Sequence, residues 1–109
     1  MIFLFFIIRI RIEQLPMTLH QNRLAQTVRI RNELGLHARS AAIIAKIAQR
    51  ATAAVWIMKG NEKADASSVI DLLTLECPRD TLITITIANP SDHALLNEIA
   101  AQVEAGFGE

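Results

Sequence analysis

The spacing of apolar residues changes several times after residue 26, and the order of these changes restricts the fold. Strand patterns, most of them two-residue alternations, are predicted at 26–31, 53–59, 62–66 and 81–88. Helix patterns with a 3.6-residue spacing are predicted at 38–49, 67–75 and 91–107. Ser91 is expected to cap the last helix, and Gly106 and Gly108 to fray its end. The order βαββαβα, with helices on one side only, predicts an α+β two-layer sandwich with an antiparallel or mixed sheet.

Length and composition exclude several classes of protein. The 109 residues suffice for one domain with a modest core and are too few for two. The 11 acidic and 11 basic residues balance, so the net charge argues for binding neither to nucleic acid nor to a membrane surface, and we expect no nucleic-acid partner and no membrane insertion. Cys77 is the only cysteine, so an intrachain disulfide and two-cysteine zinc motifs are excluded. We expect a cytoplasmic protein without metal or cofactor.

The first residues differ in character from the rest. Residues 1–8 are all apolar, and they are too few to span a bilayer, which takes about 20 residues in a helix. Three interpretations stay open: translation begins at Met17, the segment is an extra strand or interface element, or it is a weak membrane anchor. Because the strand and helix patterns begin near residue 26, we treat 1–25 as an N-terminal extension and 26–109 as the domain.

The segment Asn32-Glu-Leu-Gly-Leu-His-Ala-Arg-Ser-Ala41 places His37 and Arg39 where a helix is predicted to begin, after a bend at Gly35. A neutral imidazole is a good nucleophile, since its unperturbed pKa is about 6.5. Unpaired N–H groups at a helix start, together with an arginine fork, suit the oxygens of a phosphoryl group. These N–H groups belong to Ala38, Arg39 and Ser40. A lone histidine at a helix start is more often a polar residue without a task, so the pattern needs support from elsewhere in the chain.

That support comes from a resemblance in two separated blocks. Leu34-Gly-Leu-His-Ala-Arg-Ser-Ala-Ala42 resembles the active-site signature of the HPr family, the histidine-containing phosphocarriers of the bacterial phosphoenolpyruvate-dependent phosphotransferase system. Ala66-Ser-Ser-Val-Ile-Asp-Leu-Leu-Thr-Leu75 resembles the family's second block, and Glu104-Ala-Gly-Phe-Gly-Glu109 resembles a familiar HPr ending. The resemblance implies an open-faced sandwich: a four-stranded antiparallel sheet of order 1-4-2-3 with three helices on one face. Trp56 and Met58 would then lie on or near the open face.

The resemblance also implies a function. His37 would accept phosphate through Nδ1, the pros nitrogen, from phosphorylated Enzyme I and pass it to an Enzyme IIA-type protein, with Arg39 steadying the phosphoryl group. Such a protein is a stoichiometric, monomeric phosphocarrier, a transferase component of sugar uptake or a related regulatory relay, rather than a stand-alone catalyst. Partners would dock on the first two helices. The matching positions are Ala38, Ala42, Val69, Ile70 and Leu73.

The chain departs from the family pattern at Ser40 and Asp71. Ser40 stands where proline is usual and is expected to loosen the first helical turn. Ser68 aligns with the serine that an HPr kinase/phosphorylase modifies in some bacteria, and helix capping is the alternative role. Asp71 replaces a glycine usual in the kinase-regulated branch, and its charge would repel an added phosphate. Two other functions stay open: a regulatory binding module switched at Ser68, and an α+β ligand-binding domain that only resembles the carriers.

Overall fold

The computed structural model describes residues 24–109, so the interpretations of residues 1–23, including a start at Met17, lie outside the described residues. The strands are β1 (Ala25–Arg29), β2 (Val55–Lys59), β3 (Glu62–Asp65) and β4 (Leu82–Ile87). The α-helices are α3 (Ala38–Ala48), α4 (Val69–Leu73) and α5 (His93–Glu104). Two short 3-10 turns, η2 (Pro90–Asp92) and η3 (Gly106–Gly108), flank α5. Among the described residues, no helix is both long and apolar enough to cross a membrane.

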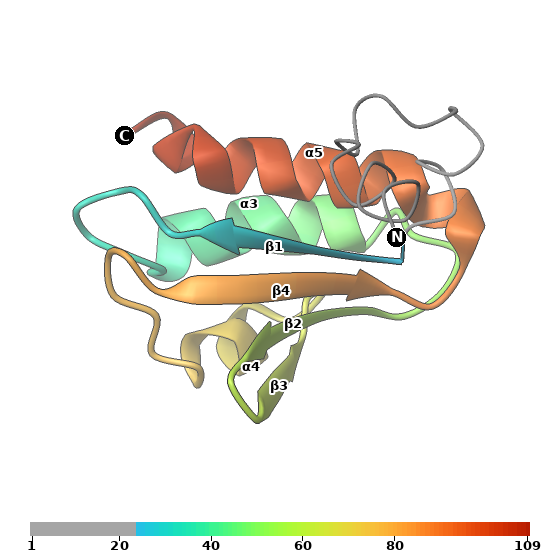
Figure 1. Ribbon diagram of the computed structural model, residues 1–109, viewed down its shortest axis with the longest axis horizontal. Helices are drawn as coiled ribbons and strands as arrows, with labels where there is room; N and C mark the ends of the chain where they lie inside the picture. The colour runs from blue at the N-terminus through green and yellow to red at the C-terminus, as the bar shows by residue number, and fades with distance from the viewer. Residues whose placement is uncertain (1–23) are drawn as a thin grey trace, which may run out of the picture.

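The strands form one antiparallel sheet of order β1-β4-β2-β3, and the helices cover one of its faces (Figure 1). β4 lies in the middle, where Ile83 pairs with Val28 of β1 and Ile85 pairs with Ile57 of β2. The open-faced sandwich and the strand order expected from the resemblance are both confirmed. The loop that joins β1 to α3 lies at one end of the two layers (Figure 1).

The core lies between the sheet and the helices. Alternate residues of β4 point into it, and α3 and α5 supply small and branched apolar side chains from the other layer. The buried members from these three elements include Ile83, Ile85, Ile87, Ala41, Ile44, Ala48, Leu96, Ile99 and Val103. Burying a branched aliphatic side chain stabilises a fold by about 1.5–3 kcal/mol. The packed sheet and helices therefore position the loops that lie at their ends.

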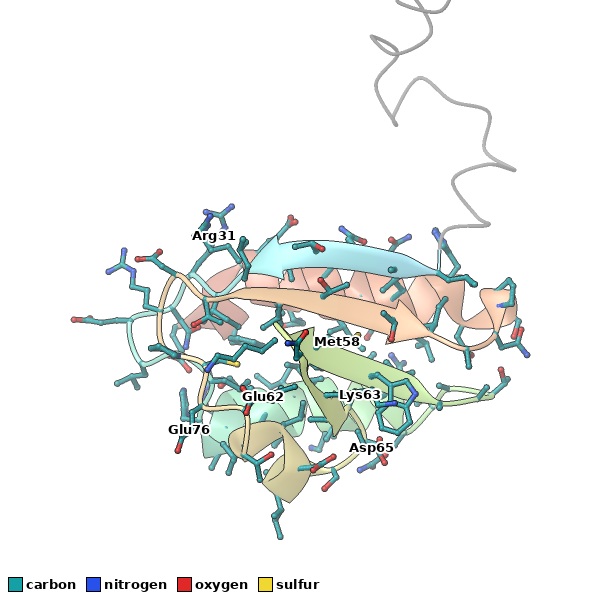
Figure 2. All side chains as sticks on the ribbon, turned by 60° about the horizontal axis from the view of Figure 1, so that its bottom comes forward. Arg31, Met58, Glu62, Lys63, Asp65 and Glu76 are labelled. Carbon is teal, nitrogen blue, oxygen red and sulfur yellow. The ribbon has the colours of Figure 1, made fainter. Side chains whose placement is uncertain are left out.

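The open face of the sheet is mostly polar, with the apolar residues Trp56 and Met58 half-buried and Leu82 exposed. Trp56 and Met58 lie on this face, as expected, because Val55 and Ile57 of the same strand point into the core. The Lys63 ammonium lies 4.2 Å from the centroid of the Trp56 ring. Figure 2 shows Met58 and Lys63 on this side of the molecule. The stacked lysine covers part of the indole, which reduces the exposed apolar surface there.

The start of α5 differs from the prediction. The Asn89 side chain, and not that of Ser91, caps this region by accepting a 2.9 Å hydrogen bond from the Ser91 N–H. Pro90 then opens the 3-10 turn η2, since its fixed φ suits a first helical position. Asp92 is buried and accepts hydrogen bonds from the backbone and hydroxyl of Thr52. Its contact with the loop after α3 sets where α5 begins.

The end of α5 also differs from the prediction. The expected fraying is wrong, because Gly106–Gly108 form the ordered turn η3. Phe107 is buried as expected, but from this turn rather than from the helix, and with a φ of 57°. The turn directs Glu109 toward the loop between β1 and α3.

Candidate active site

The loop before α3 depends on glycine at position 35. Gly35 has a φ of +68°, and an added Cβ would lie 2.4 Å from the carbonyl oxygen of Cys77 and 2.8 Å from the Cα of Pro78. The adjacent Leu36 N–H donates to that same Cys77 oxygen at 2.8 Å. Only a residue without a side chain allows the two backbones to approach this closely. This contact holds the loop in the position from which His37 begins the helix.

Ser40 forms hydrogen bonds within the first turn of α3. His37 occupies the N-cap position with an extended backbone, and its N–H donates to Ser40 Oγ at 2.9 Å. The Ser40 hydroxyl is fully buried and lies 3.2 Å from the His37 carbonyl oxygen. These hydrogen bonds stand where the family's proline would restrain the turn, and the looser turn stays a prediction. The first amides of the helix, those of Ala38, Arg39 and Ser40, have no helical carbonyl partner.

A carboxylate from the other end of the domain meets the two predicted site residues. Glu109 Oε2 lies 2.5 Å from His37 Nε2 and 2.9 Å from a terminal nitrogen of Arg39. Arg39 also donates to the Phe107 carbonyl oxygen at 2.8 Å. Hydrogen bonds from Asn32, His37 and Arg39 lower the pKa of the Glu109 carboxyl to about 2. The carboxylate is therefore ionised across the physiological range.

Asn32 fixes the other oxygen of this carboxylate. Its side chain is 6% exposed, and its amide nitrogen donates to Glu109 Oε1 at 3.0 Å and to the Gly35 carbonyl oxygen at 2.7 Å. The reasoning from sequence missed Asn32 and Glu109 as site residues. Asn32 belongs to the ten-residue segment around His37, which could have singled it out. Glu109 is separated from that segment along the chain, and only the fold joins them.

The geometry leaves one nitrogen of the imidazole for chemistry. Nε2 is engaged by Glu109, which leaves Nδ1 as the other ring nitrogen. The His37 side chain faces the backbone N–H of Ser40 in a capping-box arrangement. A neutral imidazole that donates its Nε2 proton to a carboxylate has its lone pair on Nδ1. The arrangement thus prepares Nδ1 as a nucleophile or acceptor, with a guanidinium and unpaired helix amides nearby.

The residues predicted for partner docking lie on α3 and α4, which contact each other. Ile70 is 79% exposed, Leu73 and Ala38 are exposed, and Ala42 and Val69 are half-buried. Leu34, in the loop before α3, is 72% exposed and was not predicted as part of this surface. Large exposed apolar side chains gathered beside a polar site are typical of a transient interface.

Ser68 has the capping role predicted for it. Its Oγ accepts a 3.1 Å hydrogen bond from the Asp71 N–H at the start of α4. The Asp71 carboxylate is turned toward the end of β3, where it accepts from the Asp65 N–H at 2.6 Å. Phosphorylation of Ser68 stays a prediction. Within residues 24–109, no group of histidine, cysteine and acidic residues has the arrangement of a metal site.

Comparison with known proteins decides the family. The family model described as the PTS HPr component phosphorylation site matches residues 24–105. The chain belongs to the HPr family of phosphocarriers. It is 40% identical over 87 residues to the phosphocarrier protein NPr of Shewanella violacea, covering 80% of this chain and 96% of that one. It is 32% identical over 79 residues to the HPr-like protein Crh of Bacillus subtilis, covering 72% of this chain and 93% of that one.

Solved structures give the same result for the fold. HPr-C-His from Thermoanaerobacter tengcongensis superposes with a TM-score of 0.74 at 25% identity. The match covers 80% of this chain and 98% of that chain. The family expected from the two sequence blocks is therefore confirmed.

Proposed function

We propose that His37 accepts a phosphoryl group on Nδ1 from phosphorylated Enzyme I and passes it to a histidine of an Enzyme IIA-type protein. The supporting observation is His37 at the start of α3, with Nε2 engaged by Glu109 and Arg39 beside it. In each transfer one N–P bond breaks on the donor as another forms on the acceptor. The protein thus acts as a stoichiometric, cytoplasmic carrier in sugar uptake or a related regulatory relay.

Glu109 has a positioning role in this proposal. As Nδ1 bonds to phosphorus, positive charge develops on the imidazole ring. A carboxylate at Nε2 stabilises that charge and keeps the proton on the nitrogen that does not react. Arg39 uses one terminal nitrogen for Glu109 and the Phe107 carbonyl, so its other N–H groups can reach a phosphoryl oxygen. The amides of Ala38, Arg39 and Ser40 complete the cradle.

The docking surface in this proposal is the apolar area of α3 and α4. Its proposed members are Ala38, Ala42, Val69, Ile70 and Leu73, and we include the exposed Leu34 of the loop before α3. Apolar contact suits a carrier that must bind two partners in turn, because dispersion and desolvation do not demand one fixed polar geometry. The high exposure of Ile70 makes it the principal contact residue.

Incubation with phosphoenolpyruvate and Enzyme I tests the proposal. We expect an acid-labile phosphate on the wild type and on Ser68→Ala, and none on His37→Ala. Absence of label on the wild type, with the same Enzyme I labelling a reference HPr, contradicts it. Acid-stable label at Ser68 with an HPr kinase, without transfer through His37, favours the regulatory module instead.

A further inference from the structure

A pocket of about 320 Å³ lies at the end of α3 that is remote from His37. This volume is at the lower end of the range for small-molecule sites, roughly 300–1,000 Å³. Its apolar lining residues are Ala48, Ala51, Ala53, Ala54, Val55 and Trp56. Small side chains at four positions leave the space unfilled between α3, the start of β2 and the end of β3.

A carboxylate in this pocket forms no ion pair with any residue from 24 to 109. Asp65 lines the pocket and accepts hydrogen bonds on Oδ1 from the backbone N–H and hydroxyl of Ser67, at 2.9 and 2.7 Å. Its second oxygen, Oδ2, has no hydrogen-bond or ion-pair partner within the part of the chain that the structure describes. Figure 2 shows Asp65 at the opposite end of β3 from Glu62. Asp65 therefore brings to the pocket a negative charge that forms no ion pair within the described residues, and the Lys63 ammonium of the same strand lies over the neighbouring Trp56 ring.

Two further features favour a positive ligand. The last turn of α3 ends at the pocket, and the C-terminal end of a helix bears a partial negative charge. Gln49 donates its amide nitrogen to the Ser67 carbonyl oxygen at 3.0 Å, which leaves its amide oxygen as an acceptor. The Lys63 ammonium already lies over the Trp56 ring, so the indole offers a ligand apolar contact rather than a second site for its charge.

We propose that this pocket binds a small organic cation, an amine or guanidine attached to a short apolar body. The charged group would contact Asp65, and the apolar body would lie against the alanine methyl groups and the indole. The α3 helix of 11 residues separates the pocket from His37 by about 16 Å. The site is therefore independent of the phosphoryl-transfer proposal, and either can fail without the other.

Tryptophan fluorescence tests this proposal directly, because Trp56 is the only tryptophan and the chain has no tyrosine. Benzylamine is the probe, and benzyl alcohol is its neutral counterpart. We expect a saturable change in Trp56 emission with benzylamine only. Asp65→Asn should weaken binding about tenfold, the effect of losing roughly 1.4 kcal/mol. Glu62→Gln removes the same charge from the same strand, outside the pocket, and should leave binding unchanged.

Three results overturn the proposal: no saturable change with benzylamine, equal binding of benzyl alcohol, or equal weakening by Asp65→Asn and Glu62→Gln. The cation could be a free small molecule or an arginine side chain of another protein. Agmatine and a glycine-flanked arginine peptide distinguish these sources, since tighter binding of agmatine supports the first and tighter binding of the peptide supports the second. Chemical shifts of the Ala53 and Ala54 methyl groups locate the bound probe.

Discussion

Replacing Gly35 by alanine tests whether the close approach of two loops holds His37 in place. Alanine at a φ of +68° costs roughly 1–2 kcal/mol relative to glycine. Its Cβ would also lie 2.4 Å from the Cys77 carbonyl oxygen, a backbone atom that cannot rotate away. Moving the loops apart would break the Leu36–Cys77 hydrogen bond, at a further cost of about 1 kcal/mol. We therefore expect Gly35→Ala to destabilise the fold by at least about 2–3 kcal/mol.

Gly60 provides the matched control. Its φ of +58° is similar, but an added Cβ there would have no neighbour within 4 Å. Gly60→Ala should therefore show only the conformational cost, roughly 1–2 kcal/mol. Urea unfolding followed by Trp56 fluorescence and circular dichroism measures both variants. Equal destabilisation by the two substitutions would refute the reasoning, because the contact with Cys77 would then contribute nothing. Transfer from Enzyme I should slow in Gly35→Ala and not in Gly60→Ala.

Three other predictions concern the site and its surroundings. The pKa of Glu109 is lowered from 4.5 to about 2, so the contacts of its carboxylate stabilise the fold above pH 4.5 and are lost as the pH falls toward 2. The Tm of the wild type should therefore exceed that of Glu109→Gln above pH 4.5, and the difference should shrink between pH 4.5 and pH 2. A constant difference in Tm would contradict this. Ser68→Ala should lower the free energy of unfolding by about 1 kcal/mol, because the Asp71 N–H loses the side chain that caps it. An unchanged midpoint of urea unfolding would argue against this. Ile70→Asp should slow transfer from Enzyme I severalfold with little effect on stability, whereas Leu82→Asp, 52% exposed on the open face of the sheet, should leave the rate unchanged.

Periodicity predicted the architecture well where each element buries one face. Ile83, Ile85 and Ile87 alternate with threonines, and β4 lies where this pattern places it. Element ends were predicted less well. Asn89, Ser91 and Asp92 are all residue types that cap helices, so the local sequence does not distinguish among them. The contact of Asp92 with Thr52 selects the start of α5, and that contact exists only in the fold.

The candidate site, too, could be predicted only where its features are local in the sequence. His37 and Arg39 follow from one short segment, because helix capping and turn chemistry are local. Glu109 could not be predicted as their partner. Its position depends on the ordered turn at Phe107, whose φ of 57° is unusual for a residue other than glycine. Two flanking glycines suggest fraying when only the sequence is considered, whereas burial of Phe107 and the Arg39 bond to its carbonyl oxygen hold the turn.

The central claim is that His37 is phosphorylated on Nδ1 while Glu109 engages Nε2. Nitrogen-15 and phosphorus-31 NMR of imidazole-labelled protein, recorded before and after incubation with phosphoenolpyruvate and Enzyme I, tests it most directly. We expect coupling of phosphorus to Nδ1 of His37 and a protonated Nε2 in both states. Phosphorus on Nε2, or no phosphohistidine while the same Enzyme I phosphorylates a reference HPr, would contradict the claim.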